Sequence, residues 1–328
     1  MAETSGRDPF FARLFHGGGQ REIAPDALGG EPGRDSLLWI DLDDPPDELL
    51  DRVWEACGFP EAARAFLDAG TAPETGQDGD WFWVRAVVVL DASGAGEQVP
   101  GAVLACVAGR DRVLSFRREP IPFLDRMRDG EGQGADLGQL GAESFVATLL
   151  DRQLSTYFDA LEDFELAIEQ LEEAILGGNE RQCLQELQGL RQWASRLRRM
   201  LAPHRKVFGV MSRPDFRPDQ GREADRHFVA LDTRFERAMD MVENARELVI
   251  GSFELFSNQT ALRTNDFMRV LTFVTVITGI MATVVGALGM NFQAGLFDSR
   301  DAGFWTVVGG LVLLGGASLL LGRKRRWF

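Results

Sequence analysis

The feature that most constrains this chain is a pair of long uncharged segments near its C-terminal end. Neither residues 270–297 nor residues 302–322 of the 328-residue chain contain Asp, Glu, Lys or Arg. A helix of about 20 apolar residues is long enough to cross the roughly 30 Å hydrocarbon core of a bilayer. We therefore expect two membrane spans, at about 270–290 and 302–322, within a transmembrane domain of residues 269–328.

The charge of the chain divides at the same place. Six basic and two acidic residues follow Met268, so this part carries +4, and the net charge of −15 leaves −19 for the preceding residues. Nucleic acid is not expected as a partner, because binding to phosphates requires basic surface. The negative charge of residues 1–268 would attract cations to this part of the chain. A role in solubility would explain the same charge.

Two features indicate which side of the membrane holds the chain ends. The N-terminal sequence lacks the apolar run of a secretory signal. The basic tail RKRRWF, residues 323–328, follows the second span directly, and basic residues beside a span favour the cytoplasmic side. We expect a multi-pass protein of the cell's inner (plasma) membrane with both termini in the cytoplasm.

The sequence before the spans begins with an aperiodic stretch and continues with strand patterns. Residues 1–35 are rich in Gly, Pro and Asp and are expected to be a flexible leader. Apolar, β-branched and aromatic runs then predict strands, with helical patterns between the first two. We expect an α+β cytoplasmic domain over residues 36–141. The runs are LLWIDL from Leu37, WFWVRAVVVL from Trp81, GAVLACVAG from Gly101 and RVLSFR from Arg112.

Residues 142–268 have helical patterns and are expected to form a cytoplasmic hairpin and stem. Residues 153–180 carry acidic but no basic side chains, whereas residues 181–206 carry seven basic side chains against one acidic one. This order predicts an antiparallel hairpin with complementary faces. The acidic row either faces solvent and ion pairs or concentrates cations. The expected apolar contact stripe consists of Leu161, Phe164, Ile168, Leu171 and Ile175.

The helical pattern that resumes at Arg222 has no evident stop before Met290. A continuous helix of this length would extend about 100 Å. Such a helix needs neighbours to be stable, and one copy of the first span cannot enclose a pathway. The sequence therefore predicts an oligomer with closed symmetry.

Small and polar residues recur along the first span at helical spacing. Close helix packing is one explanation. A pore-lining face is the other, since oxygen ligands in rings suit a hard divalent cation. The hydroxyl and amide groups favour the pore. The stripe consists of Asn265, Thr272, Thr275, Gly279, Ala282 and Gly286.

The first span ends in Gly289, Met290 and Asn291. With this string ahead of a short loop and a second span, the chain resembles the CorA family of divalent-cation channels, whose signature is Gly-Met-Asn at this place. The segments WIDLDDPPDELL, DRQLSTYFDALEDFELAIEQLEE, LRRMLAPHRKV and TNDFMRVLTFVT are similar to family segments too. The resemblance covers most of residues 36–328. It implies a homopentamer with a funnel-shaped cytoplasmic domain and a pore lined by the first span.

The resemblance also implies roles for residues of the pore. Gly289, Met290 and Asn291 would form the selectivity filter, where amide oxygens hydrogen-bond a hydrated ion. Capping of the helix is an alternative role for Asn291. Met268, with Leu271 or Thr272, would form a constriction that closes by dewetting. The implied pore-lining residues are Asn265, Met268, Leu271, Thr272, Thr275, Gly279, Ala282 and Gly286.

The chain departs from the family pattern in its loop and stem. The external loop lacks Pro and Glu, so attraction of cations to the outer mouth would fall to Asp298 and Asp301, weakened by Arg300. Both aspartates of the family's stem motif are missing at their aligned positions, and Asp232 could replace one only after a one-residue shift. Magnesium sensing between subunits is therefore not expected.

The leading interpretation is a channel or transporter for divalent cations, most of all Mg²⁺, with Co²⁺ or Ni²⁺ as further cargo. Its partners would be further copies of itself, the lipid bilayer and the cation, with no cofactor. The rival with the same fold is the ZntB branch, which carries Zn²⁺ coupled to protons. Zinc prefers nitrogen and sulfur ligands, yet His16, His204 and His227 are dispersed. A non-conducting scaffold or sensor is a third hypothesis, and an enzyme lacks a recognisable catalytic set.

Overall fold

A seven-stranded mixed sheet organises the N-terminal part of the chain, with the strand order β2-β1-β3-β7-β6-β5-β4. The computed structural model describes residues 8–17, 19–30, 33, 36–90, 100–130, 141–177, 180–216, 222–289 and 301–324. β3 and β7 are parallel, and the other neighbouring strands are antiparallel. The strands are β1 (Phe10–His16), β2 (Gly19–Glu22), β3 (Ser36–Asp43), β4 (Glu74–Asp78), β5 (Trp81–Val89), β6 (Gly101–Ala108) and β7 (Arg112–Arg117).

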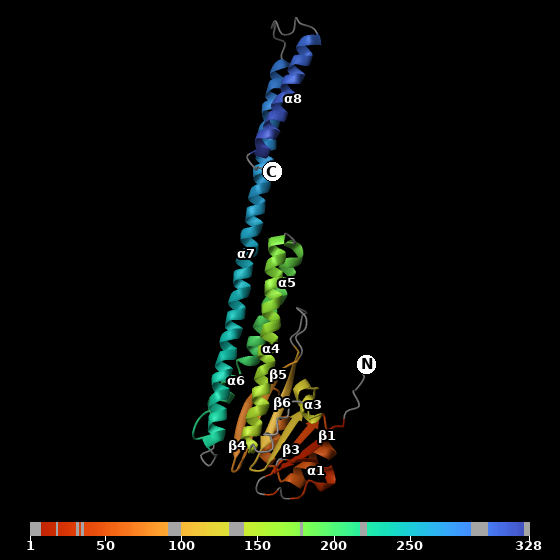
Figure 1. Cartoon of the computed structure of the whole chain (residues 1–328), viewed down its shortest axis with the longest axis vertical. Coiled ribbons are helices and arrows are strands. Elements are labelled where there is room, and N and C mark those ends of the chain that lie inside the picture. The colour runs from red at the N-terminus through yellow and green to blue at the C-terminus, as the bar shows by residue number, and fades with distance from the viewer. Residues whose placement is uncertain are drawn as a thin grey trace. The chain divides into compact units, whose positions relative to one another are not determined.

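Helices lie between and after the strands (Figure 1). Gly58 ends the first α-helix with a left-handed φ of +66°, and its N–H donates to the carbonyl oxygen of Trp54. The helices are the 3-10 turn η1 (Pro25–Ala27), α1 (Asp47–Cys57), α2 (Glu61–Asp68), α3 (Pro122–Arg128), α4 (Ala142–Gly177), α5 (Glu180–Leu201), α6 (His204–Met211), α7 (Arg222–Leu288) and α8 (Asp301–Lys324).

The sheet is covered on both faces. Alternate side chains of β3, such as Ile40, join one apolar cluster with Val53 of α1 and Phe66 of α2. On the other face, the ring of Phe145 in α4 lies 5.5 Å from that of Trp39 in β3. Burial on both faces explains why β5, β6 and β7 read as nearly continuous apolar runs.

Side chains from α4 and α6 close the free edge of β5. The pairing of β4 with β5 ends at Arg85, which leaves the edge at Val87 without a strand partner on that side. The Val87 N–H donates to Nε2 of His204 at 2.9 Å, and its carbonyl accepts from Gln153 Nε2 at 2.6 Å and Tyr157 OH at 3.0 Å. The edge is thus satisfied without another strand.

α4 and α5 pack against each other through apolar side chains, as expected for a helical hairpin. The apolar stripe predicted on α4 is buried along its length. The rings of Phe164 in α4 and Trp193 in α5 stack with centroids 4.8 Å apart. Arg198 of α5 pairs with Glu243 of α7 at 2.5 Å, so at least part of the basic face serves α7 rather than the acidic row of α4.

The expectation of a flexible leader over residues 1–35 is wrong for β1 and β2. β1 pairs with β3 along its full length, and Phe10, Ala12 and Phe15 are buried. The guanidinium of Arg13, also buried, donates to the carbonyl oxygen of Arg128 at 2.7 Å. A buried arginine in the middle of the strand interrupts the apolar pattern, so this segment was not recognised as a strand from its sequence.

The chain divides into two compact units. One comprises Met1–Ala174 and Arg181–Ser252, and the other comprises Ile175–Glu180 and Phe253–Phe328. These units differ from the expected borders at residues 141 and 268, because α4 packs on the sheet and the buried stripe of α7 ends at Ser252. α7 itself is continuous over 67 residues, as the sequence predicted.

Candidate functional site

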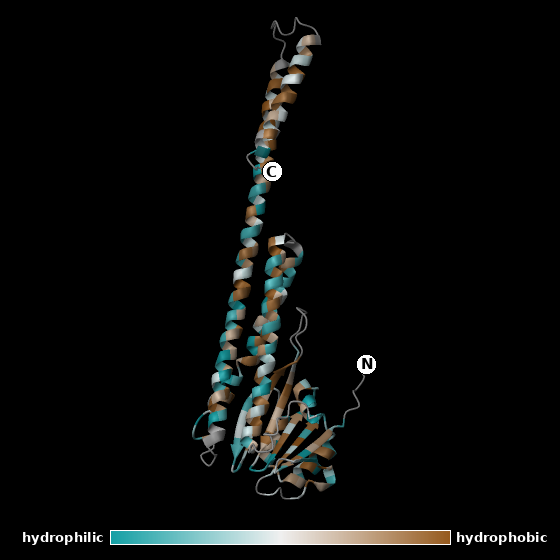
Figure 2. Ribbon diagram, viewed as in Figure 1, coloured by the Kyte–Doolittle hydropathy of each residue, from teal (hydrophilic) through white to brown (hydrophobic). Residues whose placement is uncertain are grey.

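The candidate site is the C-terminal part of α7 together with α8. Two described helical segments, Arg226–Ala287 and Ala302–Lys324, are long and apolar enough to cross a membrane by length and composition. Figure 2 shows apolar residues along both helices in this region. From Phe253 to Ala287, no side chain of α7 is buried within a single chain. Most of its surface is therefore open to lipid, water or other subunits.

α7 has a half-buried face in this region where α8 runs beside it (Figure 1). The half-buried side chains there include Val270, Phe273, Ile277 and Met281. α8 meets it with one ridge at steps of three or four residues. The buried or half-buried positions of that ridge include Gly303, Val307, Leu311, Gly315, Ser318 and Gly322.

The stripe of small and polar residues lies on the opposite face of α7. At 100° per residue, its midline is roughly 180° from that of the half-buried face. Its described members are exposed in the single chain, and a Cβ at Gly279 or Gly286 would meet no atom within 4 Å. Contacts within one chain therefore do not require these residues to be small. Leu271 lies at the margin of the stripe, about 70° from its midline.

The threonines of the stripe direct their hydroxyl protons into the helix. Thr272 Oγ1 donates to the carbonyl oxygen of Met268 and Thr275 Oγ1 to that of Leu271, each at 2.8 Å. A hydroxyl that donates its proton to a backbone carbonyl can still accept hydrogen bonds at its oxygen. The stripe therefore offers acceptor oxygens, which are the groups that a hydrated cation needs.

The structure adds residues that the sequence analysis missed. Thr283 donates to the carbonyl oxygen of Gly279 at 2.9 Å and lies beside the stripe. Asn258 and Glu254, both exposed, continue the same face toward the N-terminal part of α7. The seven-residue step from Asn265 back to Asn258 was the signal that would have found them.

The predicted filter lies mostly outside the described residues. Gly289 follows the end of α7, and its N–H donates to the carbonyl oxygen of Val285 at 3.0 Å. Met290, Asn291 and Asp298 are not among the described residues, and Asp301 is the first residue of α8. The roles of these residues remain predictions.

Asp232, the candidate stem ligand, is engaged by its own chain. Its Oδ2 accepts a hydrogen bond from Ser212 Oγ at 3.4 Å. Within the described residues, no three His, Cys, Asp or Glu side chains are grouped so that they could hold a metal ion. His204 is buried between α6 and β5, and His227 contacts Ser144 Oγ at 3.0 Å.

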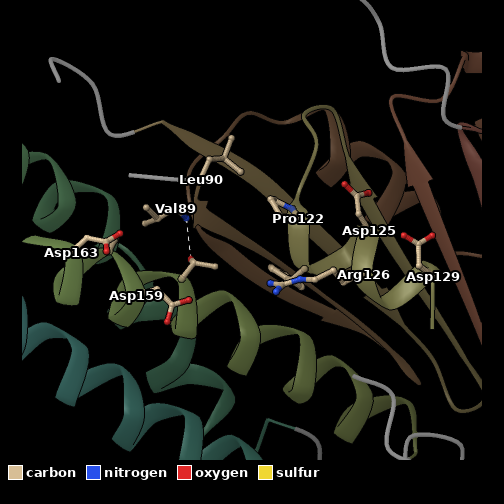
Figure 3. A pocket seen from close by; sticks show the side chains of 11 residues that line it. Val89, Leu90, Pro122, Asp125, Arg126, Asp129, Asp159 and Asp163 are labelled. Atoms are coloured by element: carbon tan, nitrogen blue, oxygen red, sulfur yellow. Dashed lines mark hydrogen bonds between the residues drawn. The ribbon is translucent and has the colours of Figure 1, made fainter. Parts of the chain in front are cut away.

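An acidic pocket of about 540 Å³ lies between α3, α4 and the end of β5. Asp125 and Asp129 come from α3, and Asp159 and Asp163 come from α4. Figure 3 shows these two pairs on different sides of the pocket. Part of the acidic row predicted on α4 therefore lines a cavity, but its carboxylates do not converge with those of α3.

An α/β body is followed by the long helix α7, whose C-terminal part is one candidate membrane span, and by α8, which is the other. Residues 34–324 match the CorA-like Mg2+ transporter protein family. The chain belongs to this family. It is a divalent-cation transporter rather than an enzyme, and the members of this family need no cofactor.

Two curated relatives span nearly the whole chain. The cobalt/magnesium transport protein CorA of Methanocaldococcus jannaschii is 23% identical over 315 residues, covering 93% of this chain and 98% of the relative. The divalent cation transporter CmaX of Pseudomonas aeruginosa is 26% identical over 322 residues, covering 91% and 93%.

Solved structures share the fold. The complete structure of the M. jannaschii CorA magnesium transporter has a TM-score of 0.73 at 20% identity, covering 98% of this chain and 99% of that chain. The ZntB cytoplasmic domain from Vibrio parahaemolyticus has a TM-score of 0.59 at 11% identity, covering 77% and 99%. At these identities the likeness concerns the fold alone.

Proposed function

We propose that the chain forms a homopentamer in the inner membrane and conducts Mg²⁺, with Co²⁺ or Ni²⁺ as further cargo, through a pore lined by α7. The position of the polar stripe carries this proposal. α8 covers one face of α7, and the stripe lies on the opposite face. If several copies of α7 surround an axis with α8 outside, the stripe faces that axis.

The chemistry of the stripe supports a hard cation as cargo. Its threonine oxygens are acceptors, and the predicted ring of Asn291 would add amide oxygens at the outer end. Mg²⁺ gives up its water reluctantly, so neutral acceptors suit a hydrated ion. A zinc pathway would favour imidazole or thiolate groups, whereas the three cysteines are buried and the stripe contains no histidine. This favours Mg²⁺ over the ZntB-like alternative.

The membrane potential can drive entry without a chemical fuel. A divalent cation that moves down the potential gains about 4.6 kcal/mol per 100 mV. Both termini would lie in the cytoplasm, so that the basic end of α8 is inside. Asp298 and Asp301 would then lie at the outer mouth, where they attract cations.

A flux measurement tests the proposal. The purified chain is reconstituted in liposomes that contain fluorescent Mg²⁺ or Zn²⁺ reporters, and a potassium gradient with valinomycin sets the potential. We expect potential-driven Mg²⁺ entry, with Asn291→Ala and Thr272→Leu each lowering the rate by about tenfold, or about 1.4 kcal/mol in the barrier.

Thr306→Leu provides a matched control. Thr306 of α8 is exposed and donates to the carbonyl oxygen of Ala302, as Thr272 does to that of Met268. Its substitution should leave the flux unchanged. Zinc entry that depends on a pH gradient would support the ZntB-like alternative, and absence of any flux would support a non-conducting scaffold.

A further inference from the structure

The two ends of the membrane segment differ in charge. Arg323 and Lys324, the last residues of α8, are exposed, and the sequence continues with Arg325 and Arg326. The other end, between the two spans, carries Asp298, Arg300 and Asp301. The sequence at one end therefore carries four consecutive positive charges, of which the first two lie on α8, while the segment between the two spans has a net charge of −1.

A further basic residue of α7 lies at the same depth. Arg269 is 20 residues before Gly289, and Arg323 is 22 residues after Asp301, which correspond to about 30 Å and about 33 Å of helix. Both distances match the thickness of a hydrocarbon core. Arg269 is half exposed, and its guanidinium forms a long ion pair of 3.7 Å with Asp266. We name Arg269 and the residues from Arg323 to Arg326 the basic belt.

We propose that the basic belt binds the headgroups of anionic phospholipids in the leaflet that it faces. The soluble part of the chain carries a large negative charge and would be repelled by an anionic leaflet. Basic residues directly beside a span attract anionic headgroups, each by about fivefold in association at the membrane surface. The basic belt would thus attract the anionic leaflet, whereas the negatively charged part of the chain before the spans is repelled by it. The inference uses the proposed function only in requiring both helices to cross the bilayer.

The test compares two lipids around the full chain. The protein is reconstituted in phosphatidylcholine bilayers with a trace of spin-labelled phosphatidylglycerol or spin-labelled phosphatidylcholine. Electron paramagnetic resonance then gives the motionally restricted fraction of each lipid. We expect the anionic lipid to associate about fivefold more strongly at low salt. The preference should disappear in 1 M salt, where exposed charges are screened.

Variants assign the effect to the belt. Replacing Arg323, Lys324 and the two arginines that follow them in the sequence with Gln should lower the preference below about twofold. Arg323→Lys with Arg325→Lys and Arg326→Lys should preserve the preference. The matched control removes four exposed basic residues outside the spans. These control substitutions are Arg191→Gln, Arg199→Gln, Lys206→Gln and Arg237→Gln.

Three results would overturn the inference. One is equal restriction of the two lipids by the unmodified chain, and the second is an equal loss in the belt and control variants. The third is displacement of the lipid by millimolar inorganic phosphate, which would show a site for free anions. The readout needs no ion flux, so a chain that enriches the anionic lipid but passes no Mg²⁺ would contradict only the proposed function.

Discussion

At the scale of single residues, a buried ionic network fixes α3 against the sheet. Asp41 of β3 is fully buried, and its carboxylate accepts from Arg128 Nε and Ser115 Oγ, each at 2.5 Å. Arg117, also fully buried, pairs with Asp41 at 3.4 Å and with Asp125 of α3 at 2.6 Å. Asp125 lines the acidic pocket as well. The network therefore connects the sheet with the wall of that pocket.

Removing one charge from this network should destabilise the folded chain, because the remaining charges stay buried without their partner. We expect Arg117→Met to lower the free energy of unfolding by about 3–5 kcal/mol. The neighbouring Arg118 is an internal control, since its pair with Asp68 is 3.8 Å long and both side chains are more than half exposed. Arg118→Met should cost less than about 1 kcal/mol. Thermal unfolding of the full chain in detergent measures both, and equal losses would contradict the account.

At the scale of elements, apolar sequence patterns predicted the buried strands but did not predict the polar strand β4. β3, β5, β6 and β7 are covered on both faces, so their sequences are apolar enough to recognise. β4 is an edge strand with the polar sequence ETGQD and no buried residue, and it exists because it pairs with β5. Tertiary partners of this kind are not visible in a local pattern. The hairpin and α7 were predictable because long helices repeat their pattern many times.

The closure of the β5 edge by α6 should make stability depend on pH. Burial lowers the pKa of His204 to about 4 because it removes the imidazole from water. The neutral ring accepts a hydrogen bond from the Val87 N–H at Nε2. An unfolded imidazole has a pKa of about 6.5, so the unfolded chain binds more protons between these values. Stability should be unaffected above pH 6.5 and fall by about 3 kcal/mol as the pH drops toward 4.

His204→Gln isolates this contribution. Glutamine keeps an acceptor for the Val87 N–H but does not titrate. Unfolding of the full chain by urea in detergent, measured from pH 7 to pH 4, should show a shallower decline for the variant. Parallel curves for the two proteins would mean that His204 does not set this dependence.

At the scale of the whole molecule, the sequence indicated the helix and the stripe but not where α8 lies. Spacing placed the small and polar residues on one face of α7. Only the structure shows α8 covering the opposite face. That arrangement could not be read from α8, whose mean composition is apolar all round. Gly315 and Ser318 lie on its half-buried ridge, whereas Gly309, Gly310 and Gly316 are exposed.

The accessibility of single cysteines tests the central claim, a water-filled path along the stripe, most directly. The native cysteines are buried, so they give little background. Thr275→Cys lies in the stripe, and its neighbour Val274→Cys, also exposed in the single chain, lies outside it. A hydrophilic, positively charged thiol reagent is added while potential-driven Mg²⁺ flux into liposomes is recorded. The account predicts that the reagent blocks flux through the Thr275→Cys channel and leaves flux through the Val274→Cys channel unchanged; equal block in both, or block only at Val274→Cys, would contradict it.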